Sequence, residues 1–499
     1  MKVERRNFVE TLSHTHLFVF SSLVKSPVMI LAIAVHKCNY LYRYNLHWFH
    51  WYFHDDVQFN ELRIFNMKFP DCAAFTLFYY VKFKTVLCNQ VSGRAMPWIL
   101  VVLSCLFYGF VHVVRICGFV SSVSRYRKVV KGNRNAVSIQ PDLELDHGEH
   151  EGVTILRPLK GKDAELYGCL KSSFIQSYRK VQILMCCVDE DDPAVEVANK
   201  VLSEFPEQDA ELLLGLDYAY GVNPKVCNLV KGYKHAKYDN IWILDANIKM
   251  HKNALSRSIG LLKNNIEIVH HLPVCVAGPT AGWGGLLDDI YMGTVHSLFY
   301  AGINAFAIAP CIMGKSNIFK RSSLDGSVKA EHGMGLQNFA KYLAEDNMMA
   351  EALWAQGGRT VLAPDVAIQP LDSSTKIREY WLRRIRWIRL RKYMVVSATL
   401  VEPFTDCFFS TAFVCLFASL GLTGFVFLTI IWFICDFINY NLMFRKAQAP
   451  VKPFFKFALV WFLRETSAFP LWIIAMWGKR VFWRNKEYRI RSDLAAEEI

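Results

Sequence analysis

The stretch VQILMCCVDE, residues 181–190, joins an unbroken apolar run to a cluster of carboxylates. A short apolar run bounded by polar residues predicts a strand that is buried on both faces. The segment that follows, AVEVANKVLSEF (194–205), carries apolar residues at helical spacing. A buried strand followed by an amphipathic helix is the repeating unit of a parallel sheet with helices packed on it.

The same alternation extends in both directions along the chain. We expect strands in VTILRPL (153–159), AELLLGL (210–216) and IWILDAN (241–247), and a helix in ELYGCLKSSFIQ (165–176). The predicted fold class is therefore α/β, a mostly parallel or mixed sheet with helices on both faces, over residues 152–395. In such sheets ligands bind beyond the carboxyl ends of the strands, where the crossover loops separate.

The composition and two flanking regions indicate a membrane protein. The chain has 499 residues, a formal charge of +13, 53% hydrophobic residues and 14% aromatic residues. WILVVLSCLFYGFVHVVRICGFV (98–120) is long enough to cross a bilayer, and we assign a transmembrane anchor to 97–121. The basic run RYRKVVKGNRN (125–135) falls in a linker at 122–151. By the positive-inside rule, residues 152–395 then face the cytosol.

A second membrane region is predicted over residues 396–480. The apolar block 407–437 is long for one span and short for two. In FALVWFLRETSAFPLWIIAMW (457–477), Arg464 and Glu465 interrupt the apolar sequence, which favours a re-entrant segment over a span. We expect residues 481–499 to be a polar tail and leave the role of the N-terminal extension, residues 1–96, open.

Several carboxylates follow predicted strands. Asp192 precedes Pro193 and is expected to cap the next helix. Asp245 ends a strand so apolar that its charge requires a partner, which favours a functional role. Glu345 and Asp346 begin the helix predicted in AEDNMMAEALWAQGG (344–358), where the helix dipole alone would favour acids. For these last two, a structural and a functional role are equally open.

Four of these elements together resemble a known signature. Asp163 in PLKGKDAEL, Asp245 in WILDAN, Asp346 in AED, and Arg383, Arg386 and Trp387 in RRIRW match the D, D, D, (Q/R)xxRW pattern. That pattern belongs to membrane-associated inverting glycosyltransferases with a GT-A fold. Several further segments are similar in sequence to the ceramide glucosyltransferases of that group. They are DEDDPA, GVNPKVCNL, AKYDNIWILD, VHHLP, AEDNMMA and FLRE. The likeness covers about residues 97–499.

The resemblance implies a reaction and a role for each aspartate. Glucose would pass from UDP-glucose to the primary hydroxyl of ceramide, giving a β-glucoside by single-displacement inversion on the cytosolic face of the Golgi. Asp346 would be the catalytic base, and Asp163 would contact the uridine of the donor. Asp245 would bind the donor through a divalent cation, Mg²⁺ or Mn²⁺. Asn247 replaces the second carboxylate of the usual DxD motif, so we expect a loose metal dependence.

The basic segment WLRRIRWIRLRK (381–392) has two interpretations that are compatible. Arg383, Arg386 and Trp387 share a helical face and would act catalytically at the mouth of the site. The remaining cations, Arg384, Arg389, Arg391 and Lys392, would be left for lipid headgroups, as in an amphipathic helix at the membrane surface.

The acceptor side is predicted less directly. By resemblance, His270 in VHHLP would lie near the lipid acceptor, although a structural histidine is as common. The apolar stretch 284–319 is either buried core or an entry path for the chains of ceramide. Expected partners are UDP-glucose, ceramide and the bilayer, with no nucleic acid; the oligomeric state is left open. The alternatives are a processive polysaccharide synthase, a dolichol-phosphate sugar transferase, or a non-enzymatic membrane scaffold or transporter.

Overall fold

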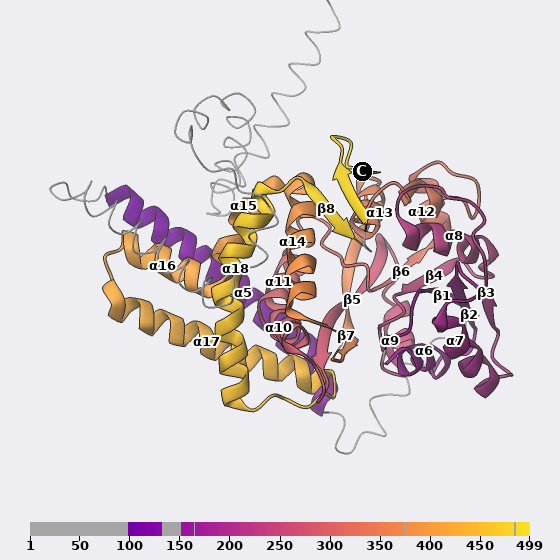
Figure 1. Cartoon of the computed structure of the whole chain (residues 1–499), viewed down its shortest axis with the longest axis horizontal. Coiled ribbons are helices and arrows are strands. Elements are labelled where there is room, and N and C mark those ends of the chain that lie inside the picture. Colours follow the sequence, from indigo (N-terminus) through magenta and orange to yellow (C-terminus); the bar gives the residue numbers. More distant parts are fainter. Residues whose placement is uncertain (1–97, 132–150, 164, 374, 484–485) are drawn as a thin grey trace, which may run out of the picture. The chain divides into compact units, whose positions relative to one another are not determined.

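The computed structural model describes residues 98–131, 151–163, 165–373, 375–483 and 486–499 (Figure 1). The N-terminal extension and most of the basic linker lie outside the described residues. The centre of the chain forms a seven-stranded sheet in the order β3-β2-β1-β4-β6-β5-β7. The strands are β1 (Val153–Leu159), β2 (Val181–Cys187), β3 (Ala210–Leu213), β4 (Asn240–Leu244), β5 (Ile266–Ala277), β6 (Ser316–Lys320) and β7 (Arg359–Leu371).

The pairing of the strands makes this a mixed sheet. β1 is parallel to β2 and β4, β2 is parallel to β3, and β5 is parallel to β7. β6 is antiparallel to both β4 and β5. The carboxyl end of β4 therefore lies beside the start of β6, so the segments after β4 and before β6 meet at one edge of the sheet.

Helices cover both faces of the sheet, as the sequence predicts. Ile155 packs with α6 (Leu166–Phe174), α7 (Pro193–Glu204) and α9 (Ala254–Ile259) in one core. The next residue of β1, Leu156, belongs to a second core on the other face because successive strand side chains point in opposite directions. That core contains α8 (Pro224–His235), α12 (Arg321–Ser327), η3 (Leu336–Phe339) and α13 (Glu345–Ala355). The predicted α/β fold class is confirmed.

Asp192 has the structural role predicted for it. Its side chain accepts a hydrogen bond from the backbone N–H of Ala194 at 2.9 Å and caps α7. It also accepts from the backbone N–H of Gly161 at 2.8 Å. The cap thus ties the loop after β1, which leads to Asp163, to the start of α7.

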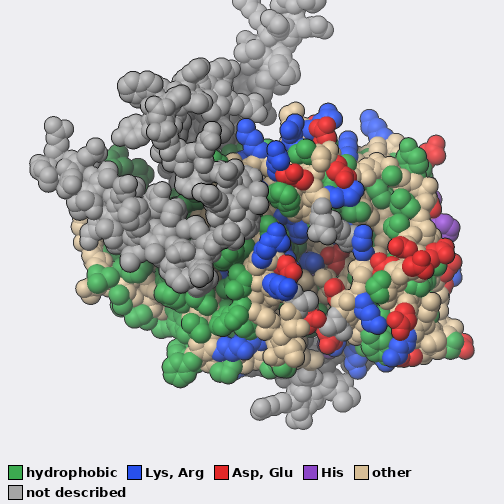
Figure 2. Space-filling model, in the orientation of Figure 1, with side chains coloured by type: hydrophobic (Ala, Val, Ile, Leu, Met, Phe, Trp, Pro, Cys, Tyr) green, Lys and Arg blue, Asp and Glu red, His purple; other side chains and the backbone are tan. Residues whose placement is uncertain are grey.

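Three described helices are long and apolar enough to cross a membrane, or up to four if one bent pair is counted as a span. They are α5 (Trp98–Lys131), α17 (Gly421–Lys446) and α18 (Phe454–Trp477). In Figure 2 hydrophobic side chains gather on the side of α17, and charged ones on the side of the sheet. An exposed apolar surface of this extent is typical of a membrane or protein–protein interaction site. Its largest members include Trp98, Leu106, Ile116, Leu422, Phe427, Ile430, Phe455, Leu459, Phe462 and Trp477.

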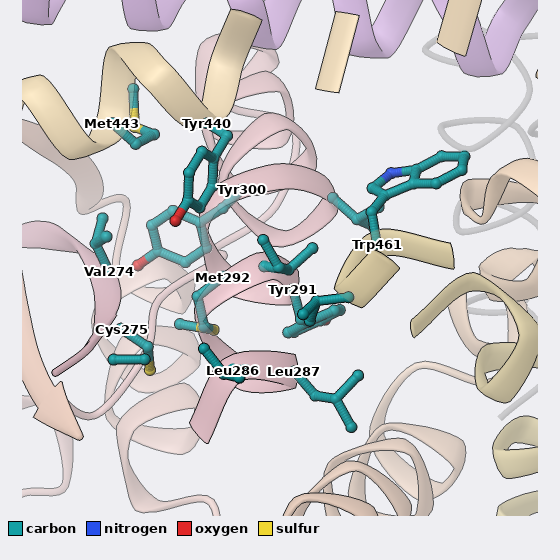
Figure 3. Packing of buried hydrophobic residues seen from close by; sticks show 14 of the residues in the cluster. Val274, Cys275, Leu286, Leu287, Tyr291, Met292, Tyr300, Tyr440, Met443 and Trp461 are labelled. Atoms are coloured by element: carbon teal, nitrogen blue, oxygen red, sulfur yellow. The ribbon is translucent and has the colours of Figure 1, made fainter. Parts of the chain in front are cut away.

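The apolar stretch 284–319 is mostly buried core. It forms α10 (Trp283–Tyr291), a π-helical turn η2 (Met292–His296) and α11 (Ser297–Phe306) before β6. Met292 and Tyr300 from this stretch pack in one cluster with Tyr440 and Met443 of α17 (Figure 3). These helices therefore join the sheet to the apolar helices.

The structure divides one apolar block of the C-terminal region and corrects the prediction for another. The block 407–437 divides into α16 (Cys407–Phe417) and α17, and the segment predicted to be re-entrant is one continuous helix, α18. Arg464 of α18 is buried and forms ion pairs with Glu465 and with Asp406. Because Arg464 pairs with buried carboxylates of the chain itself, the helix can continue through these charged residues.

The predicted polar tail is a small antiparallel sheet. Its strands are β8 (Arg480–Trp483), β9 (Lys486–Ile490) and β10 (Ala496–Glu498), in the order β10-β9-β8. Val481 and Tyr488 are buried and pack with Leu343 and Leu390. The sheet thus touches both the segment before α13 and the long helix α14 (Ile377–Met394), so it is part of the packed structure.

Gly118 of α5 and Gly302 of α11 allow these two helices to approach closely. A Cβ atom on Gly118 would lie 2.0 Å from the carbonyl oxygen of Leu298. We expect Gly118→Ala to lower the thermal stability of the detergent-purified protein, because overpacking of this kind costs about 1–3 kcal/mol. Gly109→Ala on the same helix, where a Cβ atom meets nothing within 4 Å, is the control and should be neutral or slightly stabilising. Equal melting temperatures for the two variants would contradict this packing.

Candidate active site

Asp245 follows directly after β4 and is held by two lysines. Its Oδ1 lies 2.8 Å from Nζ of Lys225, and its Oδ2 lies 3.1 Å from Nζ of Lys315. Burial would raise the pKa of the Asp245 carboxyl, but these two lysines lower it below its usual value. Asp245 is therefore a carboxylate at neutral pH, and the requirement for a partner inferred from the sequence is met by lysines.

The first of these lysines is positioned by the start of α8. Asn223 caps that helix by accepting hydrogen bonds from the backbone N–H groups of Lys225, at 3.0 Å, and Val226, at 3.3 Å. Lys225 also pairs with Glu345 at 2.9 Å and donates to the carbonyl oxygen of Gly314 at 2.9 Å. Burial would lower the pKa of Lys225, but Asp245 and Glu345 raise it above its usual value. The ammonium is thus permanently charged.

Asp346 lies next to this lysine, in the first turn of α13. Burial of its carboxyl group, with a further contribution from Glu345, raises the pKa of Asp346 to about 6. A Cβ atom on Gly314 would be 3.2 Å from Oδ2 of Asp346 and 3.3 Å from Nζ of Lys225. The absence of a side chain at Gly314 therefore leaves room beside both groups. A pocket here is lined by Lys225, Val226, Leu229, Ile243, Gly314, Asn317, Leu336, Glu345, Asp346 and Met349.

Asp163 belongs to the same region. The side chain of Asn247, two residues after Asp245, is near enough to lower the pKa of Asp163. Burial and the nearby Asp372 raise the pKa of Asp163, while Lys315 and Arg383 act in the opposite direction. Lys315 therefore pairs with Asp245 and also lowers the pKa of Asp163, while Lys225 lies between Asp245 and Glu345. The structure brings the three predicted aspartates to one edge of the sheet.

The two lysines and Gly314 are the site residues that sequence reasoning missed. Lys225 lies in the NPK sequence that begins α8, and Lys315 follows Gly314 just before β6. A glycine-lysine pair directly before a strand was the available signal. It could not be used without knowing that β6 runs antiparallel beside β4.

The arrangement does not fit a divalent cation held by Asp245. Both carboxylate oxygens face lysine ammonium groups, and a cation needs free oxygens. Among the described residues, no group of three His, Cys, Asp or Glu side chains is placed to hold a metal ion. Positive charge at this position is supplied by Lys225 and Lys315.

The RRIRW residues, all on α14, point to different partners. Nη1 of Arg383 lies 2.5 Å from Oδ2 of Asp288 in α10. Arg383 also lowers the pKa of Asp163. The guanidinium of Arg386 lies 6.0 Å from the ring centre of Trp483 in β8. The rings of Trp387 and Tyr291 are 6.5 Å apart. Arg383 thus belongs to the carboxylate cluster, while Arg386 and Trp387 connect α14 to the C-terminal sheet and to α10.

The prediction that the other cations of this helix are left for lipid is wrong. Arg384 and Arg389 are buried, the first beside Glu402 at 3.3 Å and the second donating to the carbonyl of Arg480 at 2.5 Å. Arg391 also pairs with Glu402 at 2.5 Å, and Lys392 donates to the carbonyl of Met476 at 2.7 Å. These cations bind carboxylate and backbone oxygens of the chain itself, which the charge pattern of one helix could not indicate.

His270 is completely buried in β5. Its Nδ1 lies 2.6 Å from the hydroxyl of Tyr300, and burial lowers the pKa of His270 to about 3. Burial, with further contributions from Cys311 and Asp346, raises the pKa of the Tyr300 hydroxyl. His270 is therefore a neutral residue that supports Tyr300, and the charge of Asp346 contributes to the raised pKa of Tyr300.

Comparison with known proteins identifies what the chain is similar to. The sequence model of glycosyl transferase family 21 matches residues 110–496. A ceramide glucosyltransferase of Komagataella phaffii is 36% identical, over 81% of this chain and 91% of that protein. One from Candida albicans is 31% identical, over 79% and 97%. Ceramide glucosyltransferase 3 of Caenorhabditis elegans is 31% identical, over 68% and 72%.

Proposed function

The chain belongs to glycosyl transferase family 21 and is a hexosyltransferase that forms glucosylceramide, and we propose that it uses UDP-glucose in a single inverting displacement. The observation that carries this proposal is the pairing of Asp245 with both Lys315 and Lys225 at the end of β4, with Asp163 near enough to Lys315, and Asp346 near enough to Lys225, for each lysine to lower the pKa of that carboxyl. It provides a base at one end and cations for a leaving diphosphate at the other.

Asp346 is the proposed base. The ceramide hydroxyl gives its proton to the Asp346 carboxylate while its oxygen forms the new bond to the anomeric carbon of glucose. The bond from that carbon to the UDP oxygen breaks at the same time, and UDP leaves from the opposite face. A pKa of about 6 suits this role, because such a carboxyl is ionised at neutral pH and is a stronger base than an exposed aspartate.

Charge on the departing diphosphate is met by Lys315 and Arg383. Both lower the pKa of Asp163. We assign Asp163 to the nucleoside end of the donor. Fixed cations stabilise developing charge without reorganising. Groups of the chain itself therefore account for every charge in the step. Asp346 loses its negative charge when it takes the proton, and the departing UDP gains one.

The acceptor reaches this site from the membrane. Three apolar helices and the buried α10 to α11 segment lie on one side of the sheet, so a lipid hydroxyl and a water-soluble donor meet at their junction. We assign Arg386 and Trp387 to the mouth of the site and His270, through Tyr300, to the acceptor side. The basic segment after the first apolar helix supports a cytosolic catalytic domain, and we place the protein in the Golgi membrane.

The donor and product are tested directly. Membranes that contain the chain are incubated with labelled UDP-glucose, UDP-galactose or UDP-N-acetylglucosamine and ceramide, and the lipid product is identified. We expect β-glucosylceramide from UDP-glucose alone. A polymer or a dolichol-linked sugar would indicate one of the alternative transferases, and no transfer from any donor would remove the proposal.

The pH dependence tests the base independently. Because Asp346 must be ionised, we expect kcat/KM for the donor to fall as the pH drops through about 6. Glu345→Gln removes a negative charge that raises the pKa of Asp346, so the acid limb should move to lower pH. The pH profiles of the two proteins are the measurement. A limb that stays in place or moves to higher pH would contradict the assignment.

A further inference from the structure

A fully buried carboxylate lies behind Arg383. Asp288 is on α10, its side chain is 0% exposed, and its Oδ2 lies 2.5 Å from Nη1 of Arg383. Its second oxygen, Oδ1, has no hydrogen-bond partner among the described residues. A buried carboxylate is costly to maintain unless it is paired, so Asp288 depends on the charge of Arg383.

The backbone fixes this pair in place. A Cβ atom on Gly284, at the start of α10, would lie 2.1 Å from the carbonyl oxygen of Lys376, which precedes α14. Asp288 is one turn after Gly284, and Arg383 is two turns after Lys376, so both lie on the faces that meet. The close approach of the two helices therefore sets where the Arg383 guanidinium is held.

Arg383 faces the donor side of the site. Arg383 and Lys315 lower the pKa of Asp163, whereas Asp372 raises it, and the loop that contains Asp372 joins β7 to α14. The side chain of Arg383 is 23% exposed, whereas that of Asp288 is fully enclosed. One side of the guanidinium is thus bound by Asp288 while the residue retains an exposed surface.

We propose that Asp288 is a positioning residue that holds the Arg383 guanidinium in the orientation in which it binds the diphosphate of the nucleotide sugar. Asp288 does not touch the donor. It restricts the long arginine side chain before the donor arrives, so that less conformational entropy is lost on binding. The inference rests on the proposed function, since it assigns Arg383 to the diphosphate.

The neighbouring residue provides a matched control. Asp289 is equally buried on the same helix, but its carboxylate accepts hydrogen bonds from Tyr440 and the backbone N–H of Ala277, both at 2.8 Å, and pairs with Lys452 at 3.2 Å. None of these partners belongs to the donor site. A loss of one buried negative charge from α10 can therefore be compared at two adjacent positions.

The test measures the donor KM and the inhibition constant of the product UDP in purified protein. We expect Asp288→Asn to raise both by about 10- to 100-fold, and Asp289→Asn to lower thermal stability while leaving both constants within about twofold of the parent. In an Arg383→Ala background, Asp288→Asn should cause no further rise, because the group it positions is gone.

The outcomes separate the two claims. Equal donor constants for Asp288→Asn and the parent would overturn the positioning role, and so would a rise that is as large with Arg383→Ala as without it. If the parent itself neither binds UDP nor uses UDP-glucose, the proposed donor is wrong, and the failure lies there. Asp288→Glu, which keeps the charge, should recover part of the lost donor affinity.

Discussion

Asp346→Asn is expected to lower kcat for glucosylceramide formation by about 10³-fold or more, within the range that a positioned general base contributes. The amide has nearly the same shape but cannot accept the proton of the ceramide hydroxyl. The donor KM and the amount of folded protein should change little, because Lys315 and Arg383 remain in place. Rates from membranes with matched protein levels are the measurement.

Two further substitutions make this result specific to the position of one carboxylate. Asp346→Glu keeps the acid but moves it by one methylene, and should retain partial activity. Glu351→Gln introduces the same acid-to-amide change at an exposed position of the same helix, α13, and should behave like the parent. If Asp346→Asn transfers glucose at the parental rate, Asp346 is not the base.

The parts of the fold that follow from local pattern could be predicted from the sequence. The buried run at 181–187 and the helix after it have the expected form, and Asp192 caps that helix as its position before Pro193 indicates. The placement of Asp163, Asp245 and Asp346 at one edge follows from the rule for carboxyl ends of strands together with the family signature. Both kinds of inference need only short segments or a known order of motifs.

Interactions between distant segments could not be predicted. Lys315 reaches Asp245 because β6 inserts antiparallel beside β4, and no periodicity in the sequence specifies that neighbour. The same holds for Arg464, whose partner Asp406 lies in another element, so the charged pair inside an apolar run predicts a break where α18 in fact continues. The C-terminal strands were missed because they are short and polar on one face, with their buried residues packed on distant elements.

The second large effect is expected when one of the two lysines that contact Asp245 is replaced, in Lys315→Met. We expect kcat to fall by about 10²-fold, as when one preorganised group that stabilises developing negative charge is removed. Asp245 keeps Lys225 at 2.8 Å, so the folded protein should persist. Lys320→Met, at the opposite end of the same strand β6, removes the same type of side chain away from the site and should leave kcat unchanged.

The same variant decides what neutralises the diphosphate. In the parent, lysines face both oxygens of Asp245, so a chelator such as EDTA should lower activity by less than about tenfold, a modest part of what such electrostatic stabilisation supplies. In Lys315→Met one carboxylate oxygen of Asp245 is released, and carboxylate oxygens bind Mg²⁺ or Mn²⁺. Added Mn²⁺ should therefore stimulate the variant more than the parent. Complete loss of parental activity in EDTA, with no difference between the two proteins in their response to Mn²⁺, would mean that a metal ion displaces Lys315 from Asp245 during the reaction.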